Sequence, residues 1–317
     1  TRFSDFTTAS NSLFANPDVR FVNLNVAPMD AVKLAGLSVV GDARESLHEL
    51  DEMLGEDGTG ETYRGEVATL REEWDGTRAA AIVPIDGLPS QVSLLGILNE
   101  ELAPDDVIVN AAGSAPGDLH RLWNPKSPKQ YHVEYGFSTM GYEIAGALGI
   151  KLAAPERQVV ALVGDGSYLM LSQELVTAVS ERVKLVIVLI DNQGYASIGN
   201  LSESVGSQRF GTKYRFRDEA SARLDGGVLP VDLAANMRSL GVAVIEADGV
   251  VEFRDAVRQA LAAEETTAVY VRSDPAAAGI PGGAWWDVPV AEVSELESTR
   301  EARVRYELER TAQRRYL

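Results

Sequence analysis

Residues 159–167 of the chain read Val-Val-Ala-Leu-Val-Gly-Asp-Gly-Ser, and residues 185–194 read Leu-Val-Ile-Val-Leu-Ile-Asp-Asn-Gln-Gly. Each stretch is a continuous apolar run that ends in small and polar residues. Short apolar runs without alternation are typical of strands that are buried on both faces of a parallel sheet. The two stretches therefore predict two buried strands with polar residues at their carboxyl ends.

The spacing of the two polar ends predicts that they meet. Gly166 and Asn192 are separated by 25 residues. A helix of about 14 residues rises roughly 21 Å, and a return strand of about seven residues covers roughly 23 Å. A right-handed β-α-β unit of this length brings both loops to one edge of the sheet. Ligands of open α/β sheets bind at that edge.

The residue types at these ends suit a metal-bound diphosphate. Asp165 and Asn192 offer hard oxygens of the kind that Mg²⁺ prefers, and a backbone carbonyl near Gly194 can supply a third. Gly166 lets the chain approach a phosphate, and Ser167 is expected to open a helix whose free N–H groups favour an anion. A lone Gly-Asp-Gly-Ser string more commonly marks a tight turn, but the pair of motifs favours the metal site.

The remaining pattern predicts the fold class. Apolar strands and helical segments alternate along the chain, which is typical of an α/β fold with helices on both faces of a parallel sheet. Strands are expected at 107–109, 242–245 and 268–271, and helices at 90–102, 141–152, 171–179, 232–240 and 252–263.

The first residues predict only part of a second α/β domain. Strands are expected at 20–26 and 37–40, and Asp42 is a candidate N-cap for a helix that ends near Leu54. Two strands and one helix do not complete a sheet. We therefore interpret the chain, whose first residue is not Met, as a piece of a longer protein. The expected organisation is the end of a central domain at 1–56, a helical linker at 57–84, the main domain at 85–290 and a C-terminal helix at 291–317.

Composition excludes several classes of function. The formal net charge of −18 disfavours nucleic-acid and membrane partners, because phosphate backbones and anionic lipids are repelled. The absence of cysteine excludes disulfides, thiolate nucleophiles and cysteine-based zinc sites. No apolar run is long enough to span a bilayer, and the polar start does not read as a signal peptide. A cytoplasmic location is expected.

The two loop motifs resemble the signature of thiamine diphosphate (ThDP) dependent enzymes, in which Gly-Asp-Gly is followed at this spacing by Asn. The resemblance implies that Asp165, Asn192 and the backbone carbonyl of Gly194 bind Mg²⁺. Asp191 stands where many relatives have a first Asn, but that position is usually not a ligand.

The resemblance also implies where the cofactor binds. Met140, within the stretch Tyr135–Gly141, matches the large apolar residue that bends ThDP in similar enzymes, although alone it would read as a core residue. The backbone of Ser138 and Met140 would hold the pyrimidine edge. The implied ThDP contacts are Gly113, Ser114, Ser138, Met140, Gly164, Gly166, Ser167, Asn192 and Tyr195.

Several longer strings resemble the trihydroxycyclohexane-1,2-dione hydrolases of inositol breakdown. They lie at 112–120, 131–136, 210–215 and 285–290. This likeness implies a cyclic diketone substrate whose ring C–C bond is hydrolysed to give 5-deoxy-glucuronate in myo-inositol degradation. His120, His132 and Glu134 are candidates for substrate contact, with His132 as a proton donor. A capping role for His120 and a surface pairing for His132 are equally consistent with the sequence.

Part of the catalytic machinery is expected outside this chain. In the family a Glu on a pyrimidine-binding domain, usually from a neighbouring subunit, hydrogen-bonds the pyrimidine ring of the cofactor. Glu134, Glu143 and Glu174 all lie within the main domain and are not replacements. The resemblance thus implies a partner domain from the same or a neighbouring subunit, within a homodimer or homotetramer.

Two other functions remain open from the sequence. One is a ThDP carboligase or decarboxylase of the acetohydroxyacid synthase type, and the other is a non-catalytic cofactor-binding module. A nicotinamide dehydrogenase is disfavoured, because no Gly-x-Gly-x-x-Gly string follows a strand.

We expect the chain expressed alone to show no turnover of the cyclic dione, because the pyrimidine-binding domain would be missing. A coupled assay of ring opening on the purified polypeptide checks this expectation. Measurable hydrolysis by the polypeptide alone would contradict it.

Overall fold

The computed structural model describes residues 3–56, 58–84, 87–134, 136–277, 279–280 and 285–314. The chain forms two compact units. One contains residues 74–200 and 208–281, and the other contains residues 1–73, 201–207 and 282–317. Among the residues that the structure describes, no helix combines the length and the apolar character that a membrane span requires.

The larger unit is built on a sheet of six parallel strands in the order β4-β3-β5-β6-β8-β7. The strands are β3 (Val107–Asn110), β4 (Tyr131–Val133), β5 (Val159–Gly164), β6 (Val186–Asp191), β7 (Ala243–Ala247) and β8 (Thr267–Arg272). Before and between these strands lie the helices α5 (Gln91–Glu101), α6 (Ala115–Leu122), α7 (Tyr142–Ala153), α8 (Asp165–Met170), α9 (Glu174–Ser180), α10 (Ala196–Ser204), whose last four residues belong to the smaller unit, α11 (Leu233–Ser239) and α12 (Val250–Ala262).

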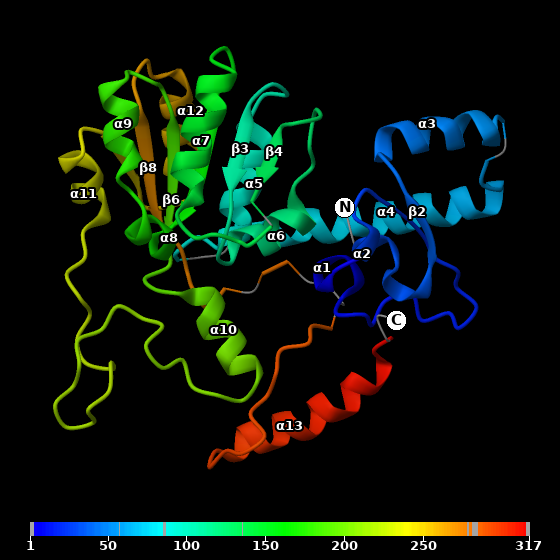
Figure 1. The fold of residues 1–317 in the computed structure, drawn as a ribbon. Coiled ribbons are helices and arrows are strands. Elements are labelled where there is room, and N and C mark those ends of the chain that lie inside the picture. Colours follow the sequence, from blue (N-terminus) through cyan, green and yellow to red (C-terminus); the bar gives the residue numbers. More distant parts are fainter. Residues whose placement is uncertain are drawn as a thin grey trace. The chain divides into compact units, whose positions relative to one another are not determined.

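Helices cover both faces of this sheet, as the continuous apolar strands predicted (Figure 1). Side chains of alternate residues point to opposite faces. Val160 and Leu162 of β5 pack with α5, α6 and α12, whereas Val159 and Ala161 pack with α7, α9 and α11. The two hydrophobic cores lie on either side of the sheet and fix its three-layer architecture.

The predicted strands and helices are confirmed apart from the start of one helix in the larger unit, whereas β4, α6 and α10 were not predicted. The strand β4 was not predicted, because three half-buried residues at a sheet edge give too short a pattern. The start predicted for the helix at 171–179 was wrong. A first helix, α8, begins at Asp165 and ends before Leu171, and a second helix, α9, begins only at Glu174. Ile85, where the main domain was expected to begin, lies outside the described residues.

The smaller unit contains a parallel pair of strands, β1 (Val22–Asn25) and β2 (Leu37–Val40). Its helices are α1 (Asp5–Thr8), α2 (Pro28–Ala31), α3 (Ala43–Leu54), most of α4 (Glu61–Ala81), which continues into the larger unit, and α13 (Glu297–Glu309), with short 3₁₀ turns at 33–35 and 310–312. Asp42 caps α3 as predicted, since its carboxylate accepts from the amides of Arg44 and Glu45. The expected helix at 291–317 begins later, at Glu297.

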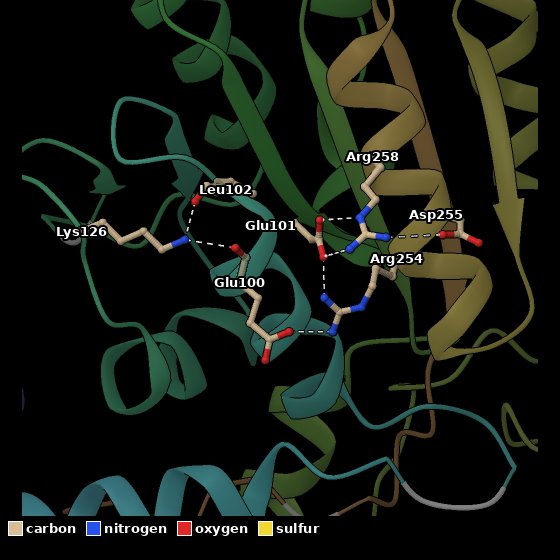
Figure 2. A network of polar contacts seen from close by, with 7 residues as sticks. All are labelled: Glu100, Glu101, Leu102, Lys126, Arg254, Asp255 and Arg258. Carbon is tan, nitrogen blue, oxygen red and sulfur yellow. Dashed lines mark hydrogen bonds and ion pairs between the residues drawn. The ribbon is translucent and has the colours of Figure 1, made fainter.

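An ion-pair network joins α5 to α12 in the larger unit (Figure 2). The Glu101 carboxylate accepts two hydrogen bonds from the Arg258 guanidinium, at 2.7 and 2.9 Å. Arg254 donates to both Glu101 and Glu100. The Glu101 side chain is only 12% exposed, and its hydrogen bonds from Arg258 and Arg254 lower its pKa below 4.5. A bidentate arginine contact shared by two helices makes this network stronger than an isolated surface pair.

We predict that Glu101→Gln lowers the free energy of unfolding by about 1 kcal/mol at neutral pH. Because folding lowers the pKa of Glu101, this stabilisation is complete above about pH 4.5 and is lost as the pH falls through the lower folded-state value. Urea unfolding of both proteins at several pH values tests this. Glu100→Gln, which removes a single contact of a half-exposed side chain, is the matched control with a smaller effect. A difference between wild type and Glu101→Gln that persists unchanged in acid would contradict the prediction.

Candidate functional site

The carboxyl ends of β5 and β6 meet as the spacing predicted. The two strands are parallel neighbours, with Gly164 opposite Ile190. The backbone N–H of Gly194 donates a 2.7 Å hydrogen bond to Oδ2 of Asp165. The Gly-Asp-Gly loop and the loop of residues 191–194 are thus joined directly at the edge of the sheet.

Several buried polar atoms without partners lie at this junction. Oδ1 of Asp165, Oδ1 of Asn192 and the hydroxyl of Tyr214 are buried and make no hydrogen bond of standard geometry in the part of the chain that the structure describes, although Tyr214 is near enough to Asp165 to lower the pKa of that carboxyl. A buried oxygen left unpaired is costly, so such a group usually serves a ligand, an ion or water. Two hard oxygens on adjoining loops fit a small divalent cation such as Mg²⁺. Within the described ranges no three His, Cys, Asp or Glu side chains could hold a metal ion, so such an ion would need amide and backbone oxygens too.

Asp191 supports the site without offering a free oxygen. Its Oδ1 accepts from the amide of Gln193 at 2.8 Å, and its Oδ2 accepts from the hydroxyl of Tyr270 at 2.6 Å. Burial, together with the negative charge of Asp191, raises the pKa of Asp165 to about 7. A cation beside Asp165 would offset both effects and favour its ionised form.

A second loop, which contains residues 212–214, packs against the 191–194 loop. The carbonyl of Thr212 accepts from the amide of Tyr195 at 2.9 Å, and Lys213 forms a β-bridge with Gly194. A methyl group added at Gly194 would lie 2.2 Å from the Thr212 carbonyl oxygen, so this close approach requires glycine. The Tyr195 and Tyr214 rings contact edge to face, with centroids 6.0 Å apart. This contact could not be predicted from the sequence, because it joins two loops that no local pattern links.

Three of the predicted cofactor contacts lie together. A methyl group added at Gly166 would lie 2.9 Å from the ring of Tyr195 and 3.5 Å from Cε of Met140. Gly166 therefore lies close to both the aromatic ring of Tyr195 and the thioether side chain of Met140. This juxtaposition is consistent with the proposed wedge role of Met140, which stays a prediction.

Ser167 differs from its expected role at a helix start. It is the third residue of α8, and its hydroxyl lies 2.8 Å from both carboxylate oxygens of Glu143. The amide of Gly141 donates to the Ser167 hydroxyl at 2.7 Å and to Glu143 at 3.0 Å. The side chain of Ser167 therefore points to α7, and the helix that Ser167 was expected to open begins two residues earlier, at Asp165.

Gly113 and Ser114 lie after β3, at the same edge of the sheet. Gly113 has φ of +93°, a conformation that favours glycine, and a methyl group added there would meet no atom of the described residues within 4 Å. The Ser114 hydroxyl donates to Oε1 of Gln91 at 2.7 Å, and Nε2 of Gln91 donates to Asp118 at 2.6 Å. Burial raises the pKa of Asp118. This chain of contacts fixes the loop before α6.

Glu134 organises the loop before Met140. Its carboxylate accepts from the amides of Phe137 at 3.0 Å and Thr139 at 2.7 Å, and these hydrogen bonds lower its pKa. Ser138, between them, has φ of +51°, which is uncommon for a residue with a side chain. Tyr135, part of the predicted cofactor stretch, lies outside the described residues. Glu134 thus holds backbone, and its proposed substrate contact stays a prediction.

The two candidate histidines lie on different elements. His120 is on α6, where its ring contacts the ring of Tyr131 edge to face and burial lowers its pKa. His132 is on β4, and its Nε2 lies 2.8 Å from the hydroxyl of Tyr142 on α7. The His132 and Tyr142 rings are stacked, with centroids 5.8 Å apart. His132 therefore has a polar partner one residue from Gly141, next to the Met140 loop.

The parallel fold, its carboxyl-edge loops and the paired Asp-Gly and Asn-x-Gly motifs define a class of cofactor-binding α/β enzymes. Comparison with known sequences identifies which class. Residues 111–271 match the family described as thiamine pyrophosphate enzyme, C-terminal TPP binding domain. The chain belongs to this family of ThDP-dependent proteins.

Comparison with individual proteins points to a narrower group than the family does. The chain is 38% identical over 327 residues to 3D-(3,5/4)-trihydroxycyclohexane-1,2-dione hydrolase 1 of Bacillus cereus, covering 95% of this chain and 51% of that protein. It is 37% identical over 340 residues to the Clostridium perfringens (strain 13 / Type A) protein of the corresponding name, covering 100% of this chain and 53% of the relative. The chain spans about half the length of the curated relatives it matches.

A solved structure supports the fold. The ThDP-dependent 4-hydroxybenzoylformate decarboxylase of Rhodococcus jostii RHA1 superimposes with a TM-score of 0.52 and 22% identity, over 61% of this chain and 34% of that chain. At this identity the match concerns the architecture, which agrees with the predicted parallel sheet flanked by helices.

We predict that Asp165→Ala weakens Mg²⁺-dependent binding of ThDP by at least about a hundredfold, because it removes the buried carboxylate at the loop junction. Asn192→Ala should weaken it less, since a neutral oxygen is lost. Calorimetric titration of ThDP with and without Mg²⁺ measures both effects. Asp105→Ala removes an exposed carboxylate just before β3, at the opposite edge, and is the matched charge control. Equal affinities for Asp165→Ala and Asp105→Ala would contradict the assignment.

Proposed function

We propose that the chain binds ThDP through Mg²⁺ and forms the diphosphate-binding part of an enzyme that hydrolyses a cyclic diketone at a ring C–C bond. The single observation that supports this most is the pair of unpartnered buried oxygens of Asp165 and Asn192, at the loop junction within the described residues. They belong to a chain of the ThDP family, and Mg²⁺ with a diphosphate would satisfy them.

Each loop at the carboxyl edge has a proposed part in binding. Asp165, Asn192 and the Gly194 carbonyl would hold Mg²⁺. Gly164 and Gly166 give the diphosphate room to approach the backbone, and the Gly113–Ser114 turn does so from the side of β3. In the acidic surroundings of this protein, the metal would attract the anionic cofactor locally.

Other side chains would orient the cofactor ring. Met140 and the ring of Tyr195, which both lie close to Gly166, offer an apolar support beneath it, and the Ser138 and Met140 backbone offers hydrogen bonds to the pyrimidine edge. When bound, ThDP supplies a carbanion that attacks a carbonyl carbon and accepts electrons as a C–C bond breaks. The residues of this chain anchor, bend and shield it.

The substrate proposal comes from the relatives. They are named trihydroxycyclohexane-1,2-dione hydrolases, so we propose the ring opening of this dione to 5-deoxy-glucuronate in myo-inositol degradation. His132 is the proposed proton donor or water-positioning group. Its hydrogen bond to Tyr142 would orient the ring and set which nitrogen carries the proton.

Activity would require a pyrimidine-binding domain with a catalytic Glu. That domain would come from the same or a neighbouring subunit in a homodimer or homotetramer, in the cytoplasm. The clustering of cofactor loops at one edge supports this proposal, because an edge site leaves the cofactor's other side for a second domain.

A substrate panel with the full-length protein, ThDP and Mg²⁺ tests the function. We expect release of an open-chain acid from the cyclic dione and no turnover of pyruvate. Turnover of pyruvate alone would favour the carboligase or decarboxylase alternative. Loss of ThDP dependence would overturn both.

Adding a separately expressed pyrimidine-binding domain to the present chain tests whether activity requires both parts. Activity should appear only with both parts, and Glu→Gln at the catalytic position of the added domain should abolish it. ThDP binding by the chain without activity in the reconstituted or full-length protein would favour the non-catalytic module.

A further inference from the structure

Glu143 is a buried carboxylate that the proposed chemistry leaves without a role. It lies in the first turn of α7, and its residue surface is 1% exposed. Among the described residues, its hydrogen-bond partners include no lysine or arginine. A carboxylate or carboxylic acid in such a place is costly unless several donors satisfy it, so its partners show what it does.

The partners of Glu143 come from three loops at the carboxyl edge of the sheet. The Ser167 hydroxyl, in the first turn of α8 directly after β5, lies 2.8 Å from each carboxylate oxygen. The amide of Gly141, next to Met140, donates to Oε2 at 3.0 Å. The amide of Ala112, beside the Gly113 turn after β3, donates to Oε1 at 3.4 Å.

These three loops carry most of the proposed cofactor contacts. Gly113 and Ser114 follow Ala112, Met140 precedes Gly141, and Gly166 precedes Ser167. We propose that Glu143 is the positioning residue that holds the β3 loop, the Met140 loop and the Asp165–Ser167 turn in register for ThDP. This inference rests on the proposed cofactor binding, and it adds a residue with no direct contact to cofactor or metal.

A simpler role would be capping of α7. A capping acid contacts the free amides of its own helix and stabilises that helix alone. Glu143 does accept from Gly141, the N-cap residue of α7, but its contacts with Ser167 and Ala112 are 24 and 31 residues away in sequence. The two roles differ in what is lost on mutation: a cap costs stability, whereas a register residue also costs cofactor affinity.

The test uses all 317 residues of the present chain. Calorimetric titration of ThDP in excess Mg²⁺ measures the affinity of each variant, and thermal unfolding without cofactor measures its stability. We expect Glu143→Ala and Glu143→Asp to bind ThDP at least tenfold more weakly than wild type, because neither side chain reaches all three loops. Glu143→Gln has the same length and keeps one acceptor, so it should bind ThDP more tightly than Glu143→Asp, although its NH2 group replaces the acceptor of one backbone amide.

Asp106→Ala is the matched control for stability. Asp106 is also a buried carboxylate with a pKa raised by burial, but it precedes β3 at the amino edge and accepts from Ala103. The substitution should lower the unfolding temperature with little change in ThDP affinity.

The outcomes distinguish failure of the register role from failure of the proposed function. If wild type does not bind ThDP with Mg²⁺, the proposed function fails first. Suppose that wild type binds ThDP and Asp165→Ala does not. If Glu143→Asp and Glu143→Ala then bind ThDP as tightly as wild type, the register role is wrong, and capping of α7 is enough to explain why Glu143 is buried there. If Glu143→Ala does not fold, the ThDP affinities of Glu143→Asp and Glu143→Gln are compared instead. Equal affinities for these two variants would overturn the inference.

Discussion

The hydrogen bond from the Gly194 amide to Asp165 is the contact on which the site depends, because it joins the loops that follow two neighbouring strands. It forms only when β5 and β6 are parallel and adjacent, so that both loops leave the same edge. It also occupies one oxygen of Asp165 and leaves the other buried and, among the described residues, unpartnered. The sheet therefore presents a fixed acceptor rather than a mobile side chain.

The same edge of the sheet concentrates buried acids. Asp165, Asp191 and Glu143 are each almost inaccessible, and each is satisfied mainly by amides and hydroxyls rather than by cations. Backbone and hydroxyl donors fix the position of a carboxylate without neutralising it. A divalent cation bound at this edge would offset the negative charge of the acids and favour their ionised forms.

Residues within the strings that resemble the dione hydrolases make defined contacts in this chain. Thr212, Lys213 and Tyr214 pack against the 193–195 loop, and Asp287 accepts from the hydroxyl of Tyr306 on α13 at 2.7 Å within the smaller unit. Glu134 clamps the amides before Met140. Each of these side chains therefore holds a loop or a helix of its own unit in place.

Periodicity and spacing alone were enough to predict the parallel sheet, most of its helices and the convergence of Asp165 with the 191–194 loop, because these are local properties of the chain. The short edge strand β4, the break between α8 and α9 and the side-chain direction of Ser167 emerged only when the elements packed together. So did the contacts of Glu143, because hydrogen bonds between loops distant in sequence depend on how the strands are ordered, and no local pattern records that order.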